Sequence, residues 1–133
     1  MPGERDLATL LQSMKPEMHD GAFVFCSISS DEKIPAALTP VHVFREHEGT
    51  TLVVRREQAE SAGLPCQFVS RLITLTVHSS LEAVGFLAAI TGLLAEAGIS
   101  VNAVSAFYHD HLFVPEHRAD DALQLLQNRS EDA

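Results

Sequence analysis

The fold of this chain is decided by residues 72–101, which read LITLTVHSSLEAVGFLAAITGLLAEAGISV. Residues 72–78 alternate apolar and polar side chains with a period of two, which predicts a strand with one buried face. Ser79 and Glu82 have the spacing of a capping box, in which two side chains satisfy free amides at the start of a helix. We therefore predict a helix from Ser79 to about Ala97.

The rest of the chain predicts further elements around this segment. After Gly98 these are a strand over residues 99–107, a turn at 108–111, a strand over 112–114 and a helix over 122–127. Before it they are a helix over 6–14 with Asp6 as N-cap, a strand over 23–28, a helical turn at 34–38, a hairpin of 41–46 with 51–55, and a helix over 57–62. Their order contains a βαββα unit twice.

Each βαββα unit lacks the fourth strand of a ferredoxin-like sandwich, so the two are expected to pair. We predict an α/β (α+β) sandwich of two interleaved ferredoxin-like βαββα units with an antiparallel sheet. The N-terminal half is residues 1–66 and the C-terminal half is residues 67–133, folded as one unit. The predicted helix over 79–97 carries two apolar stripes where a surface helix needs one, which favours self-association into a homo-oligomer. A helix wedged within one domain would show the same pattern.

Composition excludes several function classes. Of the 133 residues 46% are hydrophobic, enough for a compact core, and 9 basic against 18 acidic residues give a net charge of −9. A protein this acidic is a poor partner for nucleic acid or an anionic membrane surface. The apolar run 83–95 is well short of the ~20 residues that span a bilayer. We expect a cytoplasmic protein.

No pattern in the chain indicates an enzyme. Cys26 and Cys66 match no metal or redox spacing. Reduced thiols in a cytosolic protein are the simpler interpretation, and one disulfide is the alternative. Cys26 lies within an apolar run, where a buried inert thiol is expected. The carboxylates form no recognisable catalytic pair, and neither a phosphate-binding loop nor a dinucleotide fingerprint is present, so we predict no catalysis and no cofactor.

Residues 77–90 and 94–102 carry a more specific signal. A strand leads through a turn to Gly85 near the helix start, Gly98-Ile99 ends the helix, and Asn102 takes a polar position in the next strand. This pattern resembles the ACT domain. With the hairpins at 44–49 and 108–115, the chain is similar, over roughly residues 5–128, to the small stand-alone tandem ACT proteins of bacteria. Many amino-acid-binding ACT domains have an Asp and a Pro-Gly where this chain has residues 83–85, Ala-Val-Gly.

The resemblance implies a non-catalytic regulatory module that binds a small metabolite, with an amino acid as the favoured ligand, at an interface between ACT units. Amides at the helix start would receive the carboxylate, Asn102 would accept from the ammonium, and Gly85 would allow close approach. The candidate ligand-binding residues are Ser79, Ser80, Glu82, Val84, Gly85, Phe86, Asn102, His109, Asp110 and His111. The alternative is that these residues only cap and pack, in a ligand-free oligomeric scaffold or protein-interaction module.

His109 and His111 are two residues apart, and residues i and i+2 of a strand face the same side. Two imidazoles could share a metal ion, but a stable site needs a third and usually a fourth ligand. Packing in the turn, contact with the ligand and a metal all stay open at this point, and we assign no metal.

Overall fold

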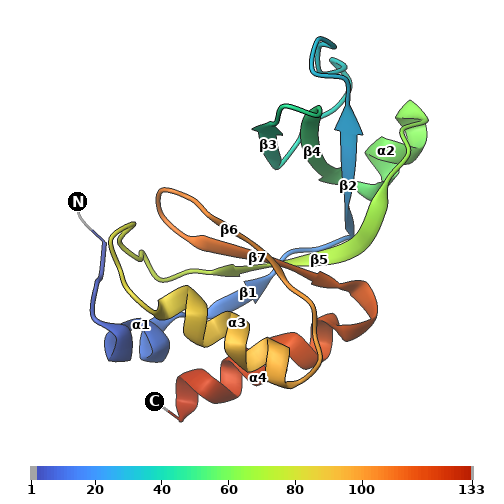
Figure 1. Ribbon diagram of the computed structural model, residues 1–133. Coiled ribbons are helices and arrows are strands. Elements are labelled where there is room, and N and C mark those ends of the chain that lie inside the picture. Colours follow the sequence, from blue (N-terminus) through green and yellow to red (C-terminus); the bar gives the residue numbers. More distant parts are fainter. Residues whose placement is uncertain (1–2, 133) are drawn as a thin grey trace. The chain divides into compact units, whose positions relative to one another are not determined.

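The computed structural model describes residues 3–132, and their packing forms two compact units (Figure 1). Unit 1 holds residues 3–20 and 71–132, and unit 2 is Gly21–Ser70. From the sequence we expected a division between residues 66 and 67. The division by packing differs because the first helix and the first strand pack with the C-terminal segment of the chain.

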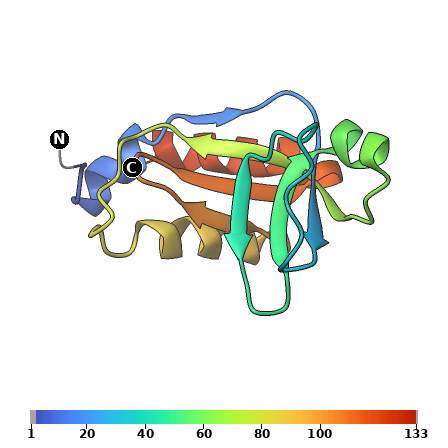
Figure 2. The same ribbon diagram turned by 90° about the horizontal axis from the view of Figure 1, so that it is seen from above.

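Unit 1 is a sheet with helices on one face (Figures 1 and 2). Its strands are, in order across the sheet, β1 (Pro16–Met18), the second part of β5 (Gln67–Leu75), β7 (Asp110–Pro115) and β6 (Asn102–Ser105). Its helices are α1 (Leu7–Ser13), α3 (Phe86–Glu96) and α4 (Ala119–Glu131), the last preceded by the 3-10 turn η1 (Glu116–Arg118). Figure 2 shows α4 behind strands β5 and β7.

The pleat of β7 divides its side chains between the two faces of the unit 1 sheet. Leu112 and Val114 are fully buried in the core beneath the helices, together with Ile90 and Leu94 of α3. Successive strand residues point to opposite faces, so His111 lies on the face away from the helices. Asp110 points to the helix side, as Leu112 does.

Local signals at the helix ends are confirmed. Asp6 caps α1, because the Thr9 amide donates to its carboxylate at 3.0 Å. After α3, Gly98 adopts a left-handed φ of +73°. The amides of Gly98 and Ile99 then donate to the carbonyls of Ala95 and Leu94, each at 3.0 Å, which is a Schellman ending.

The predicted start of α3 is wrong. The helix begins at Phe86 and not at Ser79, so the capping box of Ser79 and Glu82 does not form. The N-terminal segment pairs here instead: the Glu4 amide donates to the carbonyl of His78 and the Ser80 amide donates to the carbonyl of Glu4, both at 2.8 Å. This pairing holds residues 78–80 extended, which is incompatible with helix.

Several other bounds differ from the sequence prediction. The strand predicted over 72–78 is β5, Gln67–Leu75, which starts and ends earlier. The strand predicted over 99–107 shortens to β6, and the helix predicted over 122–127 lengthens to α4. Strand β1 was not predicted: it pairs with β5, a contact that its three residues do not signal.

Unit 2 has β3 (His42–Arg45), β4 (Thr50–Arg55), β2 (Phe23–Ile28) and the first part of β5, in that order across the sheet. Helix α2 (Arg56–Ala62) packs on this sheet, and Ala59 joins the apolar cluster of β2 and β4. The predicted hairpin and short helix are confirmed. The predicted helical turn at 34–38 is a single turn, closed by the Leu38 amide on the Pro35 carbonyl at 3.0 Å.

Candidate functional site

A cavity of about 80 Å³ lies in unit 1, where residues 79–83 and the start of α3 meet the β6–β7 hairpin. Its lining combines hydroxyl groups, one carboxylate and apolar side chains. The lining residues are Ser79, Ser80, Leu81, Ala83, Phe86, Leu87, Ser105, Ala106 and Asp110.

Asp110 places a carboxylate in this cavity, and only 7% of the residue is exposed. The Ser79 hydroxyl donates to Oδ2 at 3.1 Å, and the Ser105 hydroxyl donates to Oδ1 at 2.6 Å. These two donors orient the carboxylate but are neutral, and a buried charge favours a partner of opposite sign. The cavity is therefore suited to a cationic group.

The start of α3, in contrast, favours a negatively charged group. Gly85 is the N-cap residue with φ +91°, a left-handed conformation that glycine adopts without strain, and no side chain caps the helix. The first amides of a helix have no partner within it, and the helix dipole favours negative charge there. Phe86 and Leu87, the first two helical residues, line the cavity. One small cavity thus adjoins both a carboxylate and an anion-favouring helix start.

Comparison with known families assigns both parts of the sequence. Models described as ACT domain match residues 2–71 and residues 67–128. The chain belongs to the ACT domain family. ACT domains are regulatory, non-catalytic modules that often bind small ligands such as amino acids and often oligomerise. The cavity lies in the second ACT domain of this chain.

Solved structures agree with this assignment. A Vibrio cholerae protein of unknown function, described as a possible transport protein, is 46% identical with a TM-score of 0.82, over 93% of this chain and 95% of that one. An Agrobacterium tumefaciens protein is 19% identical with a TM-score of 0.75, over 86% and 87% of the two chains. The aspartate kinase regulatory subunit of Thermus thermophilus shares the fold at 8% identity, with a TM-score of 0.65 over 88% and 97%. A search of curated proteins found no match.

The second ACT domain brings four of the predicted site residues together. Ser79, Ser80, Phe86 and Asp110 line the cavity, and Gly85 stands beside it as the N-cap of α3. Sequence reasoning missed Ser105, Leu81, Ala83, Leu87 and Ala106. Ser105 had a usable signal: it pairs with Asp110 across the predicted hairpin, and paired residues share a face.

Other predicted residues lie outside the cavity. Val84 is 84% exposed, and Glu82 is exposed with its carboxylate 3.9 Å from Arg5. Asn102 pairs with Phe113, so it lies on the sheet face away from the helices. Asn102 and Asp110 therefore serve opposite faces of the same sheet.

His109 and His111 do lie on one side, with ring centroids 6.2 Å apart. Their neighbours do not complete a metal site: residues 3–132 contain no group of three or more His, Cys, Asp or Glu side chains placed to hold an ion. His111 Nδ1 is instead 2.9 Å from the hydroxyl of Thr74, which is 2.7 Å from His19 Nε2. With one proton, the Thr74 hydroxyl donates to one ring and accepts from the other.

The hydrogen-bonded row of His111, Thr74 and His19 predicts that the free energy of unfolding depends on pH. Burial, then the charges of His109 and His19, lower the pKa of His111 below its ordinary value of 6.5. The unfolded chain therefore binds this proton more readily than the folded protein does. The contribution of neutral His111 is complete above pH 6.5 and is lost as the pH falls toward the lowered folded pKa.

The check is the free energy of unfolding from urea titrations across this range for the protein and for His111→Asn, which keeps a polar group beside Thr74. We expect a weaker loss of stability on acidification in the variant. The matched control is His117→Gln on the exposed turn η1. Equal pH slopes for the protein and His111→Asn would contradict the assignment.

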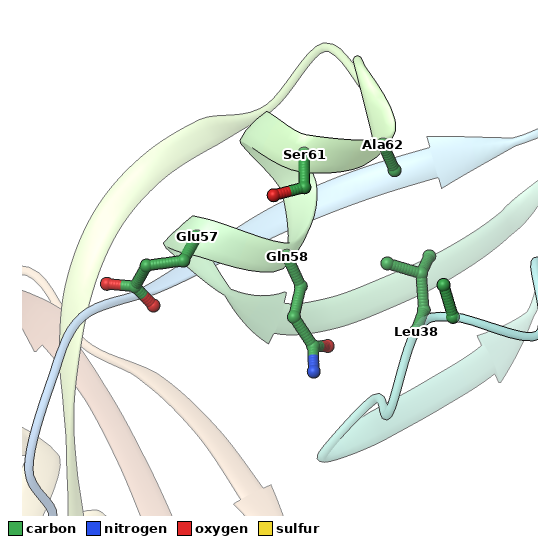
Figure 3. A pocket seen from close by; sticks show the side chains of 6 residues that line it. Leu38, Glu57, Gln58, Ser61 and Ala62 are labelled. Carbon is green, nitrogen blue, oxygen red and sulfur yellow. The ribbon is translucent and has the colours of Figure 1, made fainter.

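A second cavity, of about 290 Å³, lies in unit 2 between α2 and residues 37–38 (Figure 3). Gln58 closes one side, because its side-chain carbonyl accepts from the Thr39 amide at 3.0 Å. Glu57 extends away from Leu38 in this view. Its polar lining residues Glu57, Gln58 and Ser61 are not buried, whereas Asp110 is, so we place the candidate site in unit 1. No helix within residues 3–132 combines the length and apolar character needed to cross a bilayer.

Proposed function

We propose that this protein is a sensor whose second ACT domain binds an amino acid and thereby alters association with a partner. Asp110 receives the ammonium group, and the uncapped start of α3 receives the carboxylate. The observation that supports this most directly is the Asp110 carboxylate, buried in a cavity and held by two hydroxyl donors.

The size of the cavity supports binding at an interface. Its volume of about 80 Å³ equals only two or three water molecules at ~30 Å³ each, whereas ligand pockets commonly start near ~300 Å³. The cavity therefore takes the polar end of a ligand and leaves the remainder at its mouth. An ACT domain from a second copy of this chain covers that mouth and completes the site. This is the reason for proposing a homo-oligomer.

Exposed apolar side chains near the mouth fit such a covering surface. Leu81 lines the cavity and is 66% exposed. Phe107 and Tyr108 follow the lining residue Ala106 and are 66% and 59% exposed. Burying such side chains between two units removes apolar surface from water, which favours association.

The test is thermal unfolding in the presence of each of the twenty amino acids. A ligand at 100 times its Kd stabilises the folded state by about 2.7 kcal/mol, which raises Tm by several degrees. We expect one amino acid, or a chemically related few, to do so. Asp110→Asn, which removes the charge at constant size, should reduce the affinity on the order of 100-fold. The matched control is Asp120→Asn, on the exposed side of α4, with unchanged affinity.

Derivatives of the active amino acid then separate the two ends of the ligand. The N-acetyl derivative lacks the ammonium and should lose the contribution of Asp110, so that Asp110→Asn no longer changes its binding. The amide derivative lacks the carboxylate and should bind weakly while staying sensitive to Asp110→Asn. Binding that is indifferent to Asp110→Asn places the ligand elsewhere, and no response in the whole panel favours the scaffold.

A further inference from the structure

The two cysteines, far apart in sequence, come together in unit 2. Strands β2 and β5 pair antiparallel with Phe25 opposite Gln67. Strand β5 begins at Gln67, so continuing this register by one residue on each side places Cys66, just before β5, beside Cys26. Opposed residues of an antiparallel pair have Cα atoms about 4.5–5.5 Å apart. Disulfide-bonded cysteines usually have Cα atoms ~4.4–6.8 Å apart, so this arrangement suits a disulfide.

A shared cavity supports the same pairing. Cys26 and Cys66 both line an opening of about 400 Å³ in unit 2, together with Phe25, Ser27, Thr51, Pro65 and Gln67. Both thiols are free. Cys66 is exposed, whereas Cys26 is only 4% exposed and belongs to the apolar cluster under α2.

We propose that Cys26 and Cys66 form a redox-active dithiol, which small disulfides of the glutathione type convert into an intramolecular disulfide. The dithiol is a modification site in the first ACT domain, separate from the candidate ligand cavity in the second. Oxidation ties the segment preceding β5 to the middle of β2.

The reaction proceeds by two exchanges. The Cys66 thiolate attacks one sulfur of the small disulfide; its S–S bond breaks, a mixed disulfide forms on Cys66, and one small thiol leaves. Cys26 then loses its proton and attacks the Cys66 sulfur, the mixed disulfide breaks, and the second small thiol leaves. Two cysteine thiols are oxidised, and one small disulfide is reduced to two thiols.

Exposure to solvent determines which cysteine attacks the small disulfide and which one resolves the mixed disulfide. Reagents in solution reach Cys66 directly. Cys26 is shielded, and burial followed by the charge of Cys66 raises its pKa, so it stays protonated and unreactive toward solutes. Once Cys66 carries the mixed disulfide, the electrophilic sulfur is held opposite Cys26, where an intramolecular attack needs no access from solvent.

The experiment exposes the folded protein to glutathione disulfide, blocks remaining thiols with iodoacetamide after unfolding, and measures intact mass and linked peptides. The measurement is made on the fraction that stays monomeric, without covalent dimers. This fraction should lose both free thiols, retain no glutathione, and yield a linked Cys26–Cys66 peptide. Cys26→Ala should retain one glutathione on Cys66. Cys66→Ser should keep Cys26 free, as its labelling after unfolding would show.

Two outcomes would overturn the proposal. One is a stable glutathione adduct on Cys66 of the unaltered protein, the same product that is expected for Cys26→Ala. It would mean that Cys26 cannot reach Cys66. The other is oxidation only to covalent dimers through Cys66. Dithiothreitol should reverse the expected product and restore both thiols, which separates a disulfide from irreversible oxidation of the sulfur.

Discussion

Leu94→Ala should lower the free energy of unfolding by about 3 kcal/mol, in the range measured for such truncations at buried sites. Leu94 is fully buried on α3, in the cluster that includes Leu112 of β7 and Leu126 of α4. Truncation removes apolar burial and leaves a cavity that the surrounding helices and sheet fill only in part. Urea denaturation measures the loss, and thermal unfolding should show a Tm lower by on the order of 10 °C.

The control for this prediction is Val84→Ala, two residues before the start of α3. Val84 is 84% exposed, so its truncation should change the free energy of unfolding by less than about 0.5 kcal/mol. Similar losses of unfolding free energy in the two variants would mean that α3 does not bury Leu94 in the core.

Gly3→Ala should destabilise the N-terminal segment by about 2 kcal/mol, the sum of two backbone hydrogen bonds at about 1 kcal/mol each. A Cβ at residue 3 would lie 2.6 Å from Ser79 C and from Ser80 N, and these backbone atoms have no room to yield. The segment should therefore detach from residues 78–80. Amide hydrogen exchange would report this as faster exchange at Glu4 and Ser80.

Gly92→Ala is the matched substitution with the opposite expected sign. Gly92 lies inside α3, and a Cβ there would meet nothing within 4 Å. Alanine should stabilise the helix by up to about 1 kcal/mol through propensity alone. If both variants were stabilised, the close contact of Gly3 with Ser79 and Ser80 would be excluded.

The consequences of Gly3→Ala extend to the candidate site. Ser79 and Ser80 line the cavity, and the pairing with Glu4 holds them extended beside Asp110. Detaching the N-terminal segment should therefore also weaken binding of the amino acid found in the thermal screen, whereas Gly92→Ala should leave it unchanged. The site thus depends on a segment more than seventy positions earlier in the chain.

Elements whose signals are local could be predicted from the amino-acid sequence. Residues 72–75 lie in β5 as expected, although all four are buried and not only those on one face. Asp6 accepts from an amide three residues on, and Gly98 ends α3 in a left-handed conformation that glycine adopts without strain. These features depend on neighbours within one turn or one strand. The ACT family could be identified for the same reason, because its glycine pattern marks local turns.

The start of α3 and the set of residues that share the cavity depend on contacts between distant parts of the chain. Ser79 and Glu82 have the spacing of a capping box. The backbone of Glu4, distant in sequence, instead hydrogen-bonds with the backbone of His78 and Ser80. The strand register then sends Asp110 and Ser105 to the helix side and Asn102 to the opposite face. Local spacing cannot foresee these outcomes, because a backbone group makes its hydrogen bond with whichever partner the whole fold brings nearest.

The cysteines follow the same rule. Their sequence separation matches no motif, yet the register of β2 on β5, continued one residue before the start of β5, brings Cys66 beside Cys26. Strand pairing is non-local: its register depends on burying one face of each strand and on a bulge between Phe23 and Phe25, and a shift of one residue would turn every side chain to the other face. The sequence therefore specified which residues are available for chemistry, and the pairing of strands decided which of them meet.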